Sequence, residues 1–240
     1  MTNELLNDDE RSAVYKAIYG RRDVRSLFKP DPVPPEVLAR ILKAAHRAGS
    51  VGYMQPWNFI VVEDREIKEK VKRSFERERD EAALLFEGER REKYLSYKLE
   101  GIVEAPVNLV VTSDPTRLGP QVIGRHSIPE TDVYSTCCAI QNLWLAARAE
   151  NIGVGWVSIV KREDLYEIFQ IPRRLTIVAY LCLGTVTHFP AEPDLERLGW
   201  AKRLPLGELV FFNTWLGKPP EAWGEFYMLL EEKKTHPAAL

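Results

Sequence analysis

The stretch Gly20-Arg21-Arg22-Asp23-Val24-Arg25 gathers three cations around a single acid. Arginine presents a planar fork of N–H donors that matches phosphate oxygens, and a charge-assisted hydrogen bond of this kind contributes about 1.5 to 3 kcal/mol. The stretch therefore predicts a site for a phosphorylated ligand with an acid beside the anion. A solvated basic turn at the end of a helix would have the same residues, so the surrounding chain must distinguish the two.

Composition limits the partners of the chain. Its 240 residues are 45% hydrophobic, which suits one large domain with a sizeable core, and the formal net charge of -2 argues against strong attraction to nucleic acid or an anionic membrane. The three cysteines, Cys137, Cys138 and Cys182, lack metal-ligand spacing, so we expect no metal. Neither a signal sequence nor an apolar run long enough to cross a bilayer is evident, and we expect a cytoplasmic protein.

Helical and strand-like segments alternate along the chain, with no linker that would divide the single domain expected for residues 1–240. The expected helices are 9–19, 36–47, 131–150 and 162–169, and the expected strands are 58–62, 107–112, 153–159 and 175–184. The helix at 131–150 carries few charges before its end. We therefore expect it to be buried on most sides, Cys137 included.

Two further segments have unusual composition. Residues 63–104 are mostly charged and helix-forming, which fits a lid over a site and a pair of surface helices equally well on charge pattern alone. Residues 210–215 are apolar and aromatic, so we expect them to pack on a partner or on the chain's own core.

Three motifs combine the basic stretch with small and polar residues: Arg-Arg-Asp-Val-Arg at 21–25, Ser-Val-Gly-Tyr-Met-Gln-Pro-Trp at 50–57, and Gly-Val-Gly-Trp-Val-Ser at 153–158. Together they resemble the flavin-binding nitroreductase family, over about residues 15 to 215. The likeness is greatest to the branch of the family that fragments its flavin. Asp23 stands where many ordinary nitroreductases have serine. In the second motif, Tyr53 and Met54 precede Gln55, whereas ordinary nitroreductases usually have asparagine before the Gln-Pro-Trp element.

The resemblance implies an α+β fold with a central mixed sheet flanked by helices, in an intertwined homodimer whose C-terminal segments, about residues 205–240, embrace the partner. It also implies FMN as the ligand. By matching position, the FMN-binding residues are Arg21, Arg22, Asp23, Val24, Arg25, Ser50, Leu99, Gly155, Ser158 and Arg203. The residues tied to chemistry are Asp23, which would shuttle protons near the ribityl chain, and Ser158, which would orient the flavin ring.

The reaction implied by the resemblance is the fragmentation of reduced FMN with O2 to 5,6-dimethylbenzimidazole and erythrose 4-phosphate, which supplies the lower ligand of vitamin B12. A separate flavin reductase would provide the reduced FMN, and residues 63–104 would act as a lid that excludes bulk solvent. Two alternatives stay open. One is an FMN-dependent NAD(P)H nitroreductase that keeps its flavin, and the other is a flavin-binding or storage protein without turnover.

Overall fold

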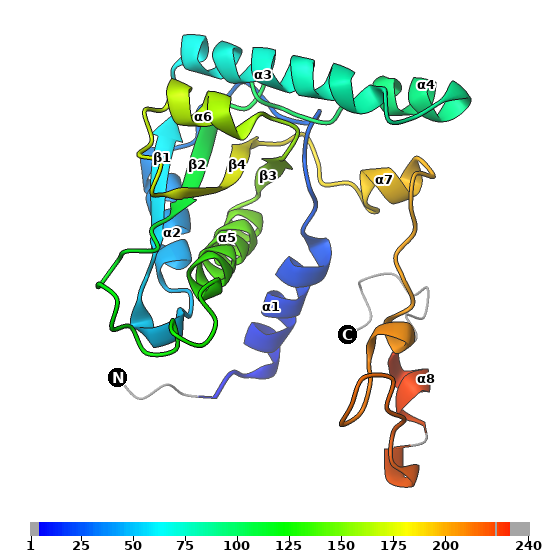
Figure 1. Cartoon of the computed structure of the whole chain (residues 1–240). Helices are drawn as coiled ribbons and strands as arrows, with labels where there is room; N and C mark the ends of the chain where they lie inside the picture. The colour runs from blue at the N-terminus through cyan, green and yellow to red at the C-terminus, as the bar shows by residue number, and fades with distance from the viewer. Residues whose placement is uncertain (1–4, 224, 231–240) are drawn as a thin grey trace. The chain divides into compact units, whose positions relative to one another are not determined.

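The computed structural model describes residues 5–223 and 225–230 (Figure 1). Residues 21–189 form one compact unit, and the described residues before 21 and after 189 form another. The first unit holds all three motifs that carry the resemblance. The prediction of one domain with a lid and a dimer-embracing segment stays a prediction.

The larger unit is built on a four-stranded sheet. Its strands are β1 (Trp57–Val62), β2 (Val107–Ser113), β3 (Ile152–Val157) and β4 (Thr176–Thr185). Their order is β1-β2-β4-β3 and every neighbouring pair is antiparallel, so that Val110 faces Ile60 on one side and Tyr180 on the other. All four strands and the α+β class were predicted correctly. The sheet was expected to be mixed. Among the described residues, the one parallel pairing is an isolated bridge between Asp23 and Val154.

Helices cover both faces of this sheet. They are α2 (Pro35–His46), α3 (Arg65–Ala83), α4 (Gly88–Ser96), α5 (Thr131–Ala149) and α6 (Arg162–Ile168). Successive residues of a strand point to opposite faces. Leu109 accordingly joins the core beneath α2 and α5, whereas its neighbour Val110 joins the core beneath α3 and α6. The sheet is thus a layer between two pairs of helices (Figure 1).

The central helix α5 is less buried than its composition suggests. Ile140, Leu143 and Ala147 are buried against the sheet and α2, as expected. The prediction for Cys137 was wrong: this residue is exposed, and so are its neighbours on the same face, Tyr134, Cys138 and Gln141. The reason is that one chain covers only the face of α5 that points toward the sheet.

The charged segment at 63–104 is largely helical, as predicted: it contains α3 and α4, whereas residues 97–104 are not helical. Asp64 caps α3, because its side-chain Oδ1 accepts hydrogen bonds from the N–H groups of Glu66 at 2.8 Å and Ile67 at 3.2 Å. Val71 and Phe75 form the buried stripe of α3. The structure does not test whether these helices act as a lid.

The smaller unit contains the predicted first helix, α1 (Asp8–Gly20), and several short elements: α7 (Asp194–Arg197), η2 (Leu206–Leu209), η3 (Glu221–Trp223) and α8 (Phe226–Leu230). In the aromatic segment 210–215, the Phe212 ring lies 5.6 Å from Phe226 and 5.9 Å from Trp223. The segment therefore packs in part on its own unit. Residues 224 and 231–240 of the predicted C-terminal arm lie outside the described residues. No helix among those described is both long and apolar enough to span a bilayer.

Candidate functional site

The basic stretch at 21–25 lies along the outer edge of β3. Val24 is 1% exposed, and its N–H donates to the Val154 carbonyl at 3.0 Å. This close approach depends on Gly155, because a Cβ at that position would lie 2.1 Å from the Val24 carbonyl oxygen. A strand glycine that admits a second backbone is a recognised use of the residue. Gly155 therefore fixes where Asp23 and Arg25 are held.

The Asp23 carboxylate is held at both oxygens. Oδ1 accepts the N–H of Trp156 at 3.0 Å, and Oδ2 accepts a hydrogen bond from Nη2 of Arg25. The Asp23 side chain is 29% exposed and that of Arg25 is 15% exposed. The pair is thus ordered by the sheet edge but still open to a ligand. The Trp156 N–H is a hydrogen-bond partner of Asp23 that the sequence did not reveal.

The arginines are organised by α5. The Arg21 guanidinium lies 4.7 Å from the centre of the Trp144 ring, and the Trp144 indole N–H donates to the Arg22 carbonyl at 3.2 Å. Nη1 of Arg22 donates to the Arg21 carbonyl at 2.7 Å. Nε of Arg25 is buried without a hydrogen-bond partner among the described residues. Because a buried N–H donor without an acceptor is costly, this atom marks a place that an anionic ligand could complete.

Three predicted residues lie farther along the chain. Ser158 directly follows β3 and is exposed. Leu99 follows α4, is partly buried and packs against the core beneath α3. Arg203 belongs to the smaller unit and is exposed, so its contact with a phosphate stays a prediction.

Within a single copy of the chain, the loop that carries Ser50 lies far from the arginines. Oγ of Ser50 accepts the N–H of Gln55 at 3.2 Å, and the next N–H, from Val51, donates to Ser135 at 3.1 Å. Ser135 and Trp144 are nine residues apart on α5, which corresponds to about 14 Å along the helix. The Ser50 loop therefore lies near one end of this span and the arginine cluster near the other.

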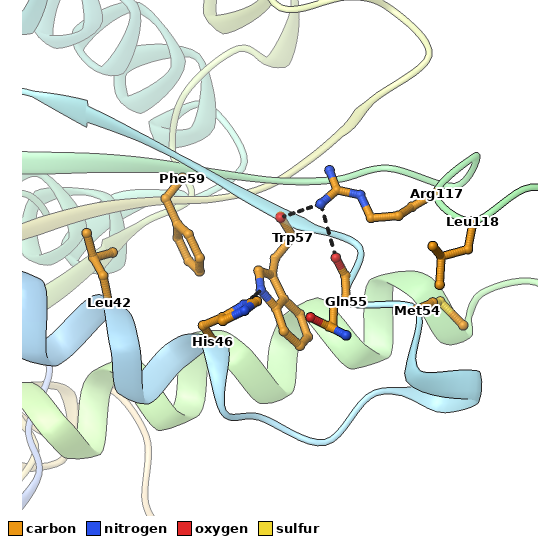
Figure 2. A pocket seen from close by; sticks show the side chains of 8 residues that line it. All are labelled: Leu42, His46, Met54, Gln55, Trp57, Phe59, Arg117 and Leu118. Carbon is orange, nitrogen blue, oxygen red and sulfur yellow. Dashed lines mark hydrogen bonds between the residues drawn. The ribbon is translucent and has the colours of Figure 1, made fainter.

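A cavity of about 340 Å³ opens beside the Ser50 loop (Figure 2). Its lining residues are Leu42, His46, Met54, Gln55, Trp57, Phe59, Arg117 and Leu118. The Trp57 indole N–H donates to Nδ1 of His46 at 3.1 Å, and Nη1 of Arg117 donates to the carbonyl of Gln55 at 3.3 Å. Arg117 thus braces a loop in which Gln55 has a φ of 44°, a conformation unfavourable for a residue with a side chain. No predicted flavin-binding residue lines this cavity.

Beside Leu99, Glu100 is a buried carboxylate with a side chain 1% exposed. It accepts hydrogen bonds from Nζ of Lys72, from Nζ of Lys98 at 2.6 Å and from the N–H of Ile102 at 2.7 Å. Burial alone would raise the pKa of Glu100, but these three donors outweigh burial and hold that pKa below the ordinary value of glutamate. The sequence did not reveal this cluster, because Lys72 lies on α3, 28 residues before Glu100.

The cluster predicts a specific dependence of stability on pH. A depressed carboxylate pKa adds stability above the unfolded-state pKa, and this contribution disappears as the pH falls through the folded-state value. Glu100→Gln is expected to lower the free energy of unfolding at pH 7 by about 2 to 3 kcal/mol, since both lysines reach solvent. Urea titrations at several pH values should show this difference shrinking below about pH 4.3. A difference independent of pH would contradict the assignment.

The chain belongs to the nitroreductase family. The sequence model described as the nitroreductase family matches residues 18–185. The fold agrees with this: a solved structure of iodotyrosine deiodinase bound to FMN and 3-iodo-L-tyrosine superimposes with a TM-score of 0.65 at 24% identity, over 84% of this chain and 99% of that one. A BluB-like flavoprotein from Clostridium difficile 630 gives a TM-score of 0.61 at 19% identity, over 84% and 99% of the two chains.

Within the family, the chain is similar to proteins named 5,6-dimethylbenzimidazole synthase. The protein of that name from Rhodospirillum rubrum is 39% identical over 204 residues, which cover 85% of this chain and 96% of the relative. A second, from Rhodobacter capsulatus, is 37% identical over 81% of this chain and 94% of the relative. These relatives belong to the branch that the Asp23 motif indicated.

Proposed function

We propose that the chain is a 5,6-dimethylbenzimidazole synthase, which uses O2 to fragment reduced FMN into 5,6-dimethylbenzimidazole and erythrose 4-phosphate. The observation that carries this proposal is the Asp23 carboxylate, held between the Arg25 guanidinium and the Trp156 amide at the edge of β3. The identity to relatives of that name supports it. We place the reaction in the cytoplasm, where the three cysteines would stay reduced.

The residues at this edge fit FMN. The Arg21 guanidinium lies over Trp144, Arg25 is paired with Asp23, and the buried Nε of Arg25 has, among the described residues, no acceptor of the kind that a phosphate oxygen or a ribityl hydroxyl could supply. Gly155 lets the Val24 backbone lie directly against β3, which holds the Asp23 carboxylate and the Arg25 guanidinium together at this edge, where a phosphorylated ligand could meet both. Reduced FMN, when bound, supplies both the electrons and the carbon skeleton of the product.

The chain's own groups have separate tasks in the proposed reaction. Asp23 would take a proton from the ribityl chain and return it, since its carboxylate is fixed at both oxygens and remains partly exposed. Ser158 would orient the ring by a hydrogen bond from the exposed end of β3. The α3 and α4 helices would cover the site and exclude bulk water. In this proposal O2 is the co-substrate, and a separate flavin reductase supplies the reduced FMN.

We further propose that the active form is a homodimer. The exposed face of α5, which includes Tyr134, Cys137 and Cys138, would be covered by a second copy. The separation of the Ser50 loop from the arginines supports this arrangement, because the loop of one copy could meet the arginines of the other. The segment at 205–240 would embrace the partner.

The test is to load the protein with FMN, reduce it chemically without oxygen, admit air, and follow the flavin absorbance and the products by mass spectrometry. Loss of flavin with appearance of 5,6-dimethylbenzimidazole is expected. Full return of oxidised flavin without a new aromatic product would refute the synthase and point to the storage alternative. Rapid bleaching of bound FMN by NADPH alone would favour the NAD(P)H nitroreductase instead.

Replacing Arg21 should separate phosphate recognition from ring recognition. A charge-assisted hydrogen bond to phosphate contributes about 1.5 to 3 kcal/mol, so Arg21→Gln is expected to weaken FMN binding about 10- to 100-fold. Riboflavin, which lacks the phosphate, should bind the variant and the parent about equally. Fluorescence titration with both ligands measures this, and Arg47→Gln on the exposed end of α2 serves as the control. Equal losses for the two ligands would show that Arg21 does not bind the phosphate.

A further inference from the structure

The Glu100 cluster joins α3 to the segment that follows α4, because Lys72 bonds a carboxylate 28 residues further along the chain. Lys72 lies on α3, Lys98 follows α4, and Ile102 lies just before β2. One helical turn before Lys72, the buried Lys68 donates from Nζ to the carbonyls of Ala105 at 2.9 Å and Pro106 at 2.6 Å. Two ammonium groups on one face of α3 therefore fasten this helix to residues 98–106.

The same segment also touches the predicted flavin-binding stretch. A Cβ on Gly101 would lie 2.7 Å from the Arg25 carbonyl oxygen and 2.6 Å from the Phe28 ring, so the two backbones are already in close contact. Residues 98–106 are thus bound to α3 and also rest against the stretch that carries Asp23 and Arg25. Leu99 lies within this connection, next to Glu100.

Residues 98–106 are joined to α3 by charged hydrogen bonds rather than by apolar packing alone. A buried carboxylate is costly unless its partners are well placed, so its hydrogen bonds favour one arrangement over neighbouring ones. Apolar packing alone would tolerate small displacements of the segment along α3. Lys98 adds a second restraint, because its Nζ also donates to Glu104 at 2.5 Å.

We propose that Glu100 is a positioning residue of the flavin site, which holds Leu99 and Gly101 in register with Arg25 and ties them to α3. The inference rests on the proposed function. Glu100 does not touch the flavin in this proposal. It acts by fixing the segment that does, and its loss should misplace the covered side of the ring more than it weakens phosphate binding.

The test compares Glu100→Gln with Glu104→Gln, which removes a carboxylate that also binds Lys98 but is 44% exposed. Three quantities are measured for parent and variants: FMN affinity, the visible circular dichroism of bound FMN, and the yield of 5,6-dimethylbenzimidazole per FMN consumed after reduction and aeration. Glu100→Gln is expected to bind FMN within threefold of the parent, with an altered dichroism spectrum and at least a tenfold lower yield. Glu104→Gln should match the parent in all three.

An unaltered spectrum and yield in a folded Glu100→Gln protein would overturn the proposal. If that variant does not fold, Lys72→Gln removes only the tie to α3 and should change the spectrum and the yield in the same direction. Absence of product from the parent itself would instead refute the proposed function. The dichroism comparison would still test Glu100, so the two failures can be told apart.

Discussion

Asp23→Asn is expected to lower the rate of 5,6-dimethylbenzimidazole formation by at least about 100-fold, the usual loss when a positioned proton-transfer group is removed. Asparagine can still accept the Trp156 N–H through its side-chain oxygen, so the edge of β3 should keep its shape. Its amide, however, carries no charge and cannot take a proton at neutral pH. FMN affinity is expected to change less than about tenfold, because the three arginines remain.

The measurement is single-turnover product formation from reduced FMN, alongside a fluorescence titration of FMN binding. Asp31→Asn is the matched control, since Asp31 is exposed on the connector after the basic stretch. It should behave as the parent does. Product formation by Asp23→Asn at the parental rate would remove Asp23 from the chemistry.

Gly155→Ala is expected to impair both folding and FMN binding. The new methyl group would lie 2.1 Å from the Val24 carbonyl oxygen, which is backbone and cannot rotate away. Either β3 or the basic stretch must move, and that movement would break the Val24 to Val154 hydrogen bond and displace the Asp23 carboxylate from Trp156. We expect the free energy of unfolding to fall by about 3 kcal/mol, at the upper end of ordinary overpacking.

Urea unfolding and FMN titration check this prediction together. FMN affinity should fall at least about tenfold, because the arginines are held by the same backbone contact. Gly49→Ala is the control: a Cβ there meets nothing within 4 Å. A Gly155→Ala protein as stable as the parent, with parental FMN affinity, would show that the close approach at β3 is unimportant for the site.

Local patterns in the sequence were enough to predict the strands and helices of the larger unit. The largely apolar run at 175–184 predicted β4 because a central strand is buried on both faces, and seven of the ten residues of β4 are buried. The apolar spacing at 36–47 predicted α2 in the same way. The basic stretch also predicted N–H donors beside a single acid, and the structure pairs Arg25 with Asp23 at the edge of β3.

Contacts between distant segments could not be predicted from such patterns. Trp144 fitted a core helix, but its ring also faces the Arg21 guanidinium, and nothing near residue 144 indicates this. Glu100 belonged to a charged, helix-forming segment, yet it is buried by donors from α3 and from the turn before β2. The predicted burial of Cys137 on α5 was wrong for a related reason. Composition does not say whether an apolar face of a helix is covered by its own chain.

The most direct measurement of the central claim is the ratio of 5,6-dimethylbenzimidazole formed to FMN lost when the reduced, FMN-loaded protein is exposed to air for one turnover. Quantitative mass spectrometry measures both species in the same sample. The proposed function predicts equimolar product and lost flavin in the parent, and almost no product in Asp23→Asn. Recovery of all the FMN in its oxidised form, with no benzimidazole, would contradict it.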